Sequence, residues 1–210
     1  MANWIRNIYF SKGGLVLKLS EKKMLKKRQE IILSAIKIVN KRGYAKATME
    51  EIAADLLMTK GSLYYYFKNK EDLIFQCHAL VLDRADEELK RHFETEKSSE
   101  EKLRNMIVTH IRYAIEEKET FNMLIQPDKT FSREQLKPIL SKRNHYAKWF
   151  DFVIEEGIRN GEFTIDEPKI GRMILLGSMN WIQQWYKPEG EMSVAEIQKI
   201  YADYLLKILK

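Results

Sequence analysis

The sequence predicts an all-α protein, and three observations support this class. Apolar residues recur at helical spacing along most of the chain, without competing strand-length alternation. Only 9 Gly and 4 Pro occur among 210 residues, which argues against a turn-rich β fold. The composition is globular, with 45% hydrophobic and 31% charged residues, and no apolar run approaches the length of a membrane span.

Residues 1–23 are expected to form an extension that precedes the first domain. Their apolar part is too short and too interrupted for a signal peptide. Two interpretations stay open: a frayed N-terminal arm, or a stretch that lies upstream of the true start. Lys12, Gly13 and Gly14 can be encoded by a purine-rich ribosome-binding site, with Val16 or Leu17 as the start, and residues 1–15 would then be untranslated.

Three helices are expected in the N-terminal part, over residues 22–41, 49–56 and 60–67. Gly43 supplies a stop signal for the first helix. Thr48 followed three residues later by Glu51 is a capping box for the second helix, and Thr59 can cap the third. The second and third helices are therefore short and separated by only a few residues.

Five longer helices are expected in the remainder, over residues 71–93, 100–117, 135–160, 168–186 and 194–209. Ser98 and Ser193 are suited to cap the helices that follow them, and Pro168 falls in a first helical turn. Pro127 and Asp128 mark a loop. The predicted C-terminal part, residues 87–210, is thus helical throughout.

Positive charge is concentrated in the N-terminal part of the chain. Residues 1–70 hold 15 Lys+Arg against 5 Asp+Glu, a net +10, whereas residues 71–210 hold 21 against 25, a net −4. This layout is usual for a nucleic-acid-binding domain joined to another domain. Charge alone is equally compatible with a solvated basic helix over residues 22–28.

Two short helices after a longer basic one are the arrangement of a helix-turn-helix, whose second helix enters the major groove by its N-terminal end. Residues 59–73 (TKGSLYYYFKNKEDL) closely resemble the recognition helix of the tetracycline-repressor (TetR) family of bacterial transcription regulators, and residues 42–44 (RGY) and 47–53 (ATMEEIA) resemble the segment before it. The resemblance covers about residues 26–86, with the motif at 48–67. It implies a DNA-binding domain followed by an all-helical ligand-binding and dimerisation domain, in a dimeric, ligand-responsive regulator that is usually a repressor.

One residue departs from the family pattern. The family usually has Gly in the turn between the two short helices, where this chain has Leu57. A leucine at positive φ is strained, so we expect either a differently shaped turn or a local cost at Leu57.

The resemblance assigns DNA-contacting roles to eight residues, namely Thr48, Thr59, Lys60, Gly61, Ser62, Tyr64, Tyr66 and Lys70. Of these, Lys60, Gly61 and Ser62 match positions that face base edges, and Lys60 can donate to guanine O6 and N7. The hydroxyl and ammonium groups of Thr48, Tyr64, Tyr66 and Lys70 match phosphate contacts, which fix register. Tyr65 is interpreted as a packing residue, and Leu63 and Phe67 match core positions.

Aromatic and Met side chains in the C-terminal part are candidates for an apolar ligand pocket: Phe121, Met123, Trp149, Phe152, Met173, Trp181 and Trp185. Plain core packing is the alternative. Residues 177–190 (GSMNWIQQWYKPEG) resemble a segment of a subset of TetR proteins that sense acyl-CoA thioesters. The alternative is that these residues serve only dimerisation and helix capping. A CoA ligand needs cations for its phosphates, and Arg143 and Lys148, with Arg112 and Lys142, are the candidates, unless they form a solvated basic face.

The last two predicted helices carry apolar stripes, formed by Ile170, Ile174, Gly177, Trp181 and Trp185 on one and by Ile197, Ile200, Tyr204, Leu205 and Ile208 on the other. The resemblance implies that these helices pair with their symmetry mates as a four-helix bundle. We therefore expect a homodimer whose partners are operator DNA and a small hydrophobic ligand.

Enzymatic function is not expected. The sequence lacks common nucleotide-binding, metalloprotease and hydrolase motifs, and its four His residues are scattered. The lone Cys77 excludes an intramolecular disulfide. We expect no catalytic residue, metal or cofactor, and a cytoplasmic protein without membrane contact. Alternatives are a TetR-type regulator with a drug-like inducer, a non-specific nucleoid-type binder, and, from a different class, an enzyme.

Overall fold

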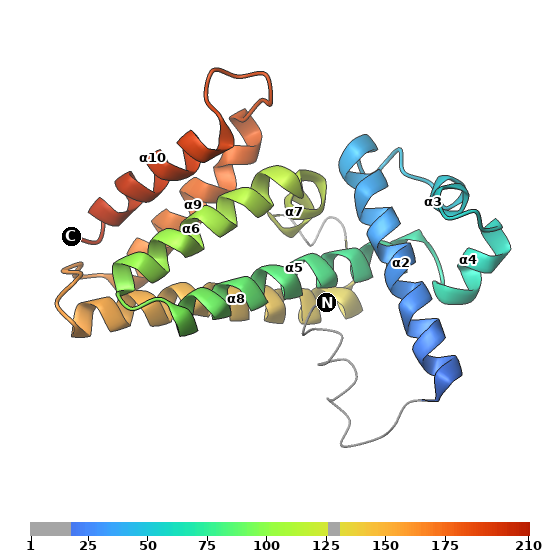
Figure 1. Ribbon diagram of the computed structural model, residues 1–210, viewed down its shortest axis with the longest axis horizontal. Helices are drawn as coiled ribbons and strands as arrows, with labels where there is room; N and C mark the ends of the chain where they lie inside the picture. The colour runs from blue at the N-terminus through green and yellow to red at the C-terminus, as the bar shows by residue number, and fades with distance from the viewer. Residues whose placement is uncertain (1–17, 126–130) are drawn as a thin grey trace. The chain divides into compact units, whose positions relative to one another are not determined.

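The computed structural model describes residues 18–125 and 131–210, with the side chains of residues 122–125 outside the description. All regular elements in these ranges are α-helices, which confirms the predicted all-α class (Figure 1). Residues 1–17, with the alternative starts at Val16 and Leu17, and the predicted loop at Pro127 and Asp128 lie outside the described residues.

The chain divides into two compact units, which we call the head unit (Met1–Arg84) and the body unit (Ala85–Lys210). The division falls inside helix α5 (Lys70–Thr95), so one continuous helix belongs to both units. We describe each unit separately.

The head unit contains α2 (Leu19–Arg42), α3 (Met49–Asp55), α4 (Lys60–Tyr66) and the first part of α5. Apolar side chains from all four helices form its core, among them Ile31, Ile52, Leu63 and Leu73, which are completely buried. Burial of such side chains is the main favourable term in folding. At the end of α2, Gly43 adopts φ 80° and donates its N–H to the Val39 carbonyl at 2.8 Å, so a predicted stop signal is confirmed.

The body unit contains the rest of α5 with α6 (Ser99–Glu116), α7 (Lys118–Ile125), α8 (Arg133–Arg159), α9 (Pro168–Trp185) and α10 (Val194–Lys207). Helix α6 contacts α7, α8, α9 and α10, so it is the centre of the unit (Figure 1). Its inner face is fully buried at Leu103, Met106, Ile107 and Ile111. The predicted caps are confirmed, because the Ser98 and Ser193 hydroxyls accept the backbone N–H groups of Glu101 and Glu196.

Helix α7 is absent from the sequence prediction, which has no helix between residues 117 and 135. The reason is the junction, because α6 ends and α7 begins around the single residue Glu117. Glu117 donates its N–H to the Tyr113 carbonyl, and its own carbonyl accepts from the Phe121 N–H. The residue at the junction is thus neither Gly nor Pro, the residues that would mark a helix end in the sequence. Apolar residues spaced by three and four at Phe121, Leu124 and Ile125 are the signal that could have revealed it.

Candidate DNA interface and effector site

The two short helices of the head unit begin at threonine caps. Thr48 accepts the N–H of Glu51 at 3.2 Å, and Thr59 accepts the N–H of Ser62 at 3.1 Å. The hydroxyls of Thr59 and Ser62 also lie 2.8 Å apart. All three side chains are exposed, so each cap positions a hydroxyl at the surface where a helix-turn-helix meets DNA.

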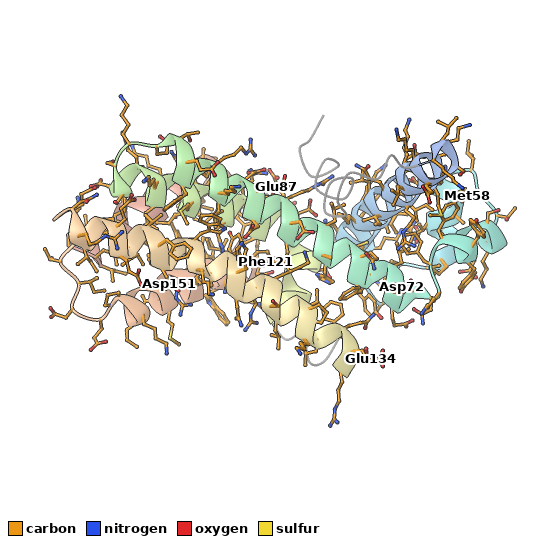
Figure 2. All side chains as sticks on the ribbon, turned by 90° about the horizontal axis from the view of Figure 1, so that it is seen from below. Met58, Asp72, Glu87, Phe121, Glu134 and Asp151 are labelled. Atoms are coloured by element: carbon orange, nitrogen blue, oxygen red, sulfur yellow. The ribbon has the colours of Figure 1, made fainter. Side chains whose placement is uncertain are left out.

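The turn between α3 and α4 has the hydrogen-bond pattern that normally ends a helix at glycine. Met58 donates its N–H to the Ala53 carbonyl at 2.8 Å, and Leu57 donates to Ala54 at 3.1 Å (Figure 2 labels Met58). Leu57 adopts φ 53° and its side chain is 98% exposed. The turn therefore keeps the shape that glycine would give it, and Leu57 carries a local cost on the order of 1–2 kcal/mol, as expected from the sequence.

Helix α4 presents one face to the core and the other to solvent. Leu63 and Phe67 are buried, whereas Lys60, Gly61 and Ser62 are exposed and Tyr64 is partly so. Tyr66 is half-buried, with its backbone carbonyl bound by Arg28. The tyrosines thus differ in burial along a single helical turn.

The interpretation of Tyr65 as a packing residue is wrong. Its side chain is 76% exposed, and its ring meets the ring of Tyr66 edge-on at 5.1 Å. Leu63 and Phe67 point inward, and a residue midway between them on a helix faces the opposite way. Tyr65 is therefore available at the surface beside Tyr64.

Two lysines of the expected DNA interface are held by defined partners. Lys60 forms an ion pair with Glu50 of α3, and its ammonium also lies 5.9 Å from the Tyr64 ring centre. The hydrogen bond between Lys60 and Glu50 lowers the pKa of Glu50 and raises the pKa of Lys60. Lys70 donates to the Tyr44 carbonyl at 2.5 Å and lies 4.3 Å from that ring. Glu50 was not assigned to the DNA interface from the sequence, although it lies only two residues after Thr48, which was assigned to it.

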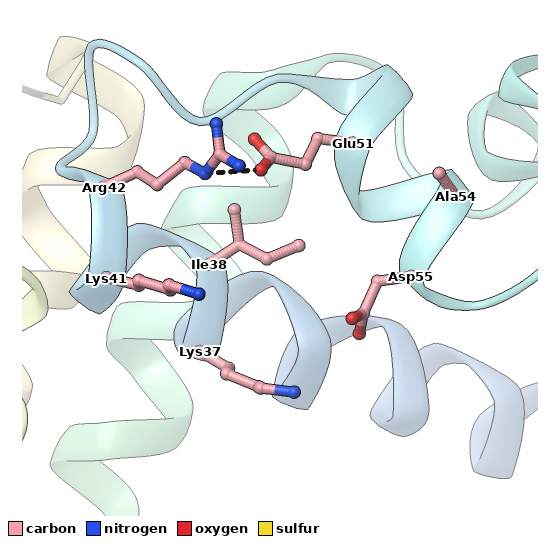
Figure 3. A pocket seen from close by; sticks show the side chains of 7 residues that line it. All are labelled: Lys37, Ile38, Lys41, Arg42, Glu51, Ala54 and Asp55. Carbon is pink, nitrogen blue, oxygen red and sulfur yellow. Dashed lines mark ion pairs between the residues drawn. The ribbon is translucent and has the colours of Figure 1, made fainter.

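A cleft of about 320 Å³ opens between α2 and α3, and Figure 3 shows the seven residues that line it, namely Lys37, Ile38, Lys41, Arg42, Glu51, Ala54 and Asp55. Arg42 crosses the cleft to pair with Glu51 at 2.6 Å, and Asp55 accepts a hydrogen bond from Ser34 at 2.8 Å. The Arg42–Glu51 ion pair and the Ser34–Asp55 hydrogen bond thus join α2 to α3.

The candidate effector residues of the body unit fall into separate groups. Phe121 is buried, and its ring meets the His110 ring at 5.2 Å (Figure 2 labels Phe121). Trp149 packs against Phe93 at 5.4 Å and against Phe152 at 5.9 Å, and its indole N–H donates to Asp86 at 3.0 Å. Phe152 remains 45% exposed.

Three further candidates lie elsewhere. The structure places Met173, Trp181 and Trp185 on the exposed face of α9 and does not bring them together with Phe121. The side chain of Met123 lies outside the described residues. Of the candidate cations, Arg143 and Lys148 are exposed on α8, whereas Arg112 pairs with Glu88.

A buried polar chain, which sequence reasoning missed, connects three helices of the body unit. His110 of α6 bonds through Nδ1 to the Tyr146 hydroxyl at 3.0 Å and through Nε2 to the Asn180 amide oxygen at 3.1 Å. Burial lowers the pKa of His110 to about 4, so the imidazole is neutral near pH 7. Its Nε2–H then donates to Asn180, and the Tyr146 hydroxyl donates to Nδ1.

The same region holds an unsatisfied acceptor. Gln183 is 1% exposed and donates to the Asn180 carbonyl at 3.1 Å, but its amide oxygen has no hydrogen-bond partner among the described residues. Such groups are rare in folded proteins, and a bound water or ligand is one explanation for them. Asn180 belongs to the segment 177–190 that resembles acyl-CoA sensors.

The described residues contain no group of three or more His, Cys, Asp or Glu residues arranged to hold a metal ion. Among the helices that the structure describes, none is both long and apolar enough to cross a membrane.

Comparison with known proteins decides the family. Residues 31–77 match the family model described as bacterial regulatory proteins, tetR family. Residues 96–209, more than half of the chain, match the tetracyclin repressor-like C-terminal domain. The chain belongs to the TetR family. It is therefore a DNA-binding transcriptional regulator, and α3 and α4 are its helix-turn-helix.

Individual TetR relatives agree with this assignment. The chain is 26% identical over 186 residues to the HTH-type transcriptional repressor KstR2 of Mycolicibacterium smegmatis, covering 86% of this chain and 89% of the relative. It is 23% identical over 159 residues to the fatty acid metabolism regulator protein of Bacillus subtilis, covering 73% and 80%. A crystal structure of AibR with isovaleryl coenzyme A and operator DNA shares the fold, with a TM-score of 0.71, 24% identity, and coverage of 87% and 97%.

Proposed function

We propose that this TetR regulator is a homodimeric repressor that a fatty acyl-CoA thioester releases from its operator. The observation that carries the ligand class is the polar chain to Asn180, whose backbone carbonyl accepts from Gln183, a buried residue with an amide oxygen unpaired among the described residues. An acyl-CoA has an apolar tail for the aromatic surroundings of His110 and amide N–H donors in its pantetheine arm for Gln183. A relative named as a fatty acid metabolism regulator and the AibR structure, which holds isovaleryl coenzyme A, agree with this ligand class.

The proposed dimer interface is the outer face of α9 and α10. Several large apolar side chains of these two helices are exposed, namely Ile170, Met173, Ile174, Trp181, Trp185, Ile200, Tyr204 and Ile208. A surface of this kind is normally covered by a partner. Two residues of the predicted stripe need correction, because Ile197 and Leu205 are buried inside the protomer. A two-fold axis would place two recognition helices roughly 34–36 Å apart, one turn of DNA.

Helix α5 is the proposed link between effector and DNA, because it is continuous through both units. In the body unit its residue Glu88 binds Arg112 and the Tyr113 hydroxyl of α6, and Asp86 accepts from Trp149 of α8. An acyl-CoA that changes the packing of α6 and α8 would therefore move α5. A change of a few ångströms in head spacing removes specific contacts from one half-site.

The proposed activity is regulatory, without a catalytic step or resident cofactor, and is exerted in the cytoplasm where bacterial operator DNA lies. The test is a titration of the protein–operator complex with a long-chain acyl-CoA, free CoA and the matching free fatty acid. Only the acyl-CoA should release the protein, weakening operator affinity about 5–150-fold. Equal operator affinity with and without saturating acyl-CoA would eliminate this ligand class in favour of another hydrophobic inducer.

A further inference from the structure

The ion pair between Glu50 and Lys60 lies at the DNA-facing ends of both helix-turn-helix helices. Lys60 is the first residue of α4, and Glu50 is the second residue of α3. Both side chains are more than half exposed, at 53% for Lys60 and 58% for Glu50. The first residues of a recognition helix meet base edges, so the carboxylate of Glu50 stands beside a base-contacting ammonium.

A carboxylate is unexpected on a surface that binds DNA. Phosphates dominate the affinity of DNA-binding proteins, and they attract Lys60 but repel Glu50. An exposed ion pair by itself contributes little to the stability of a fold. The carboxylate also occupies the one ammonium that α4 brings to the groove, so it weakens binding to any DNA that does not satisfy both groups.

Base pairs in the major groove satisfy both groups only in certain sequences. A carboxylate accepts from the amino group of cytosine, whereas an ammonium donates to O6 and N7 of guanine. Two side chains held in contact therefore suit a G·C-containing step, with the acceptor on cytosine and the donor on guanine. At thymine and guanine the carboxylate meets only acceptor atoms or the thymine methyl group, and at adenine the N6 amino donor lies beside the acceptor N7, which repels a carboxylate.

We propose that Glu50 is a specificity-determining residue of the head unit, which accepts from a cytosine amino group in the operator while its partner Lys60 donates to guanine. On other sequences the unpaired carboxylate opposes binding and suppresses non-specific association. Specificity of this kind comes from a group that penalises the wrong partner as well as from one that favours the right partner.

Glu51 supplies a matched control on the same helix. It carries the same charge one residue later, but its carboxylate pairs with Arg42 of α2 at 2.6 Å, across the cleft of Figure 3. Glu51 is also less exposed, at 26%. A generic effect of lowering negative charge in the head unit would be the same for both positions, whereas the proposed effect belongs to Glu50 alone.

The experiment uses the full chain and an operator selected from random DNA duplexes. Dissociation constants for this operator and for a random duplex are measured over a salt series for the wild type, Glu50→Gln and Glu51→Gln. Glu50→Gln should strengthen random-duplex binding and steepen its salt slope by about 0.9, the value expected when the released Lys60 neutralises one more phosphate. The ratio of operator to random affinity should fall about tenfold, and repeated selection should no longer return cytosine at one position of each half-site.

A double variant, Glu50→Gln with Lys60→Met, separates the pair from its surroundings and should abolish the increase in random-duplex affinity. Thermal unfolding of Glu50→Gln and of the double variant should stay close to that of the wild type, since Glu50 and Lys60 are both exposed. The proposal is overturned if Glu50→Gln leaves the affinity ratio unchanged, if it weakens operator and random duplex equally, or if Glu51→Gln lowers the ratio as much.

Discussion

Gly61 is the second residue of the recognition helix and has room for a side chain. A Cβ built there would meet only the Thr59 hydroxyl oxygen, at 3.9 Å, which is ordinary van der Waals contact. Its φ is not in the left-handed region, so neither packing nor backbone conformation in the head unit requires glycine. Glycine in a helix is nevertheless unfavourable relative to alanine. We propose that glycine is present because DNA approaches this residue closely.

Gly61→Ala should therefore have opposite effects on stability and on operator binding. The free energy of unfolding should rise by about 0.5–1 kcal/mol, since alanine loses less conformational freedom on folding. Operator binding should weaken by roughly 1–3 kcal/mol, the typical cost of overfilling a packed contact. Thermal unfolding and gel-shift titration measure the two effects. An alanine variant that binds the operator as tightly as the wild type would show that DNA does not approach Gly61 closely.

At the scale of helices, the chain His110–Tyr146–Asn180 joins α6, α8 and α9 inside the body unit. His110 has an ordinary pKa of 6.5 in the unfolded chain and about 4 in the folded one. Between these values the unfolded state binds more protons, so stability is lost as the pH falls from about 6.5 towards 4.

The pH dependence of unfolding should therefore contain a contribution from His110 of roughly 3 kcal/mol, fully lost by about pH 4. Buried His78, with a pKa lowered to about 3, adds a loss in the same direction. Comparison of wild type with His110→Gln isolates the first contribution, because His78 is common to both proteins. Denaturant unfolding at several pH values is the measurement. Parallel stability curves for the two proteins between pH 4 and 6.5 would contradict the burial of a neutral His110.

The elements were more predictable than the contacts between them. Helix ends follow from local chemistry, such as the caps at Thr48, Thr59 and Ser98 and the stop at Gly43, so the sequence predicts them within a few residues. Helix α7 was missed because its junction at Glu117 lacks such a signal. The Glu50–Lys60 pair and the His110 chain join residues that only folding brings together, and the spacing of scattered His and Glu residues cannot reveal them.

At the scale of the whole molecule, the exposed apolar face of α9 and α10 predicts assembly. Trp181 is 64% exposed on this face. Trp181→Glu should place a charge in the proposed interface and convert the dimer to a monomer, because an unpaired buried charge is costly. Light scattering at micromolar concentration measures the change. Tyr65→Glu is a control of similar exposure in the head unit and should remain dimeric, whereas a monomeric wild type would refute the proposed interface.

Monomers should also bind the operator more weakly, because two half-sites bound together gain from effective concentration. Loss of dimerisation without loss of operator affinity would mean that the heads act independently.

We propose that an acyl-CoA in the body unit and operator DNA on the head units favour different conformations of one dimer. Thermodynamic linkage then requires each ligand to weaken the binding of the other by the same factor. The direct measurement is the dissociation constant of a long-chain acyl-CoA for the free protein and for the protein saturated with its operator. We predict that operator DNA weakens acyl-CoA binding by about 5–150-fold, equal to the factor by which acyl-CoA weakens operator binding. Equal acyl-CoA affinity in both states would contradict this mechanism.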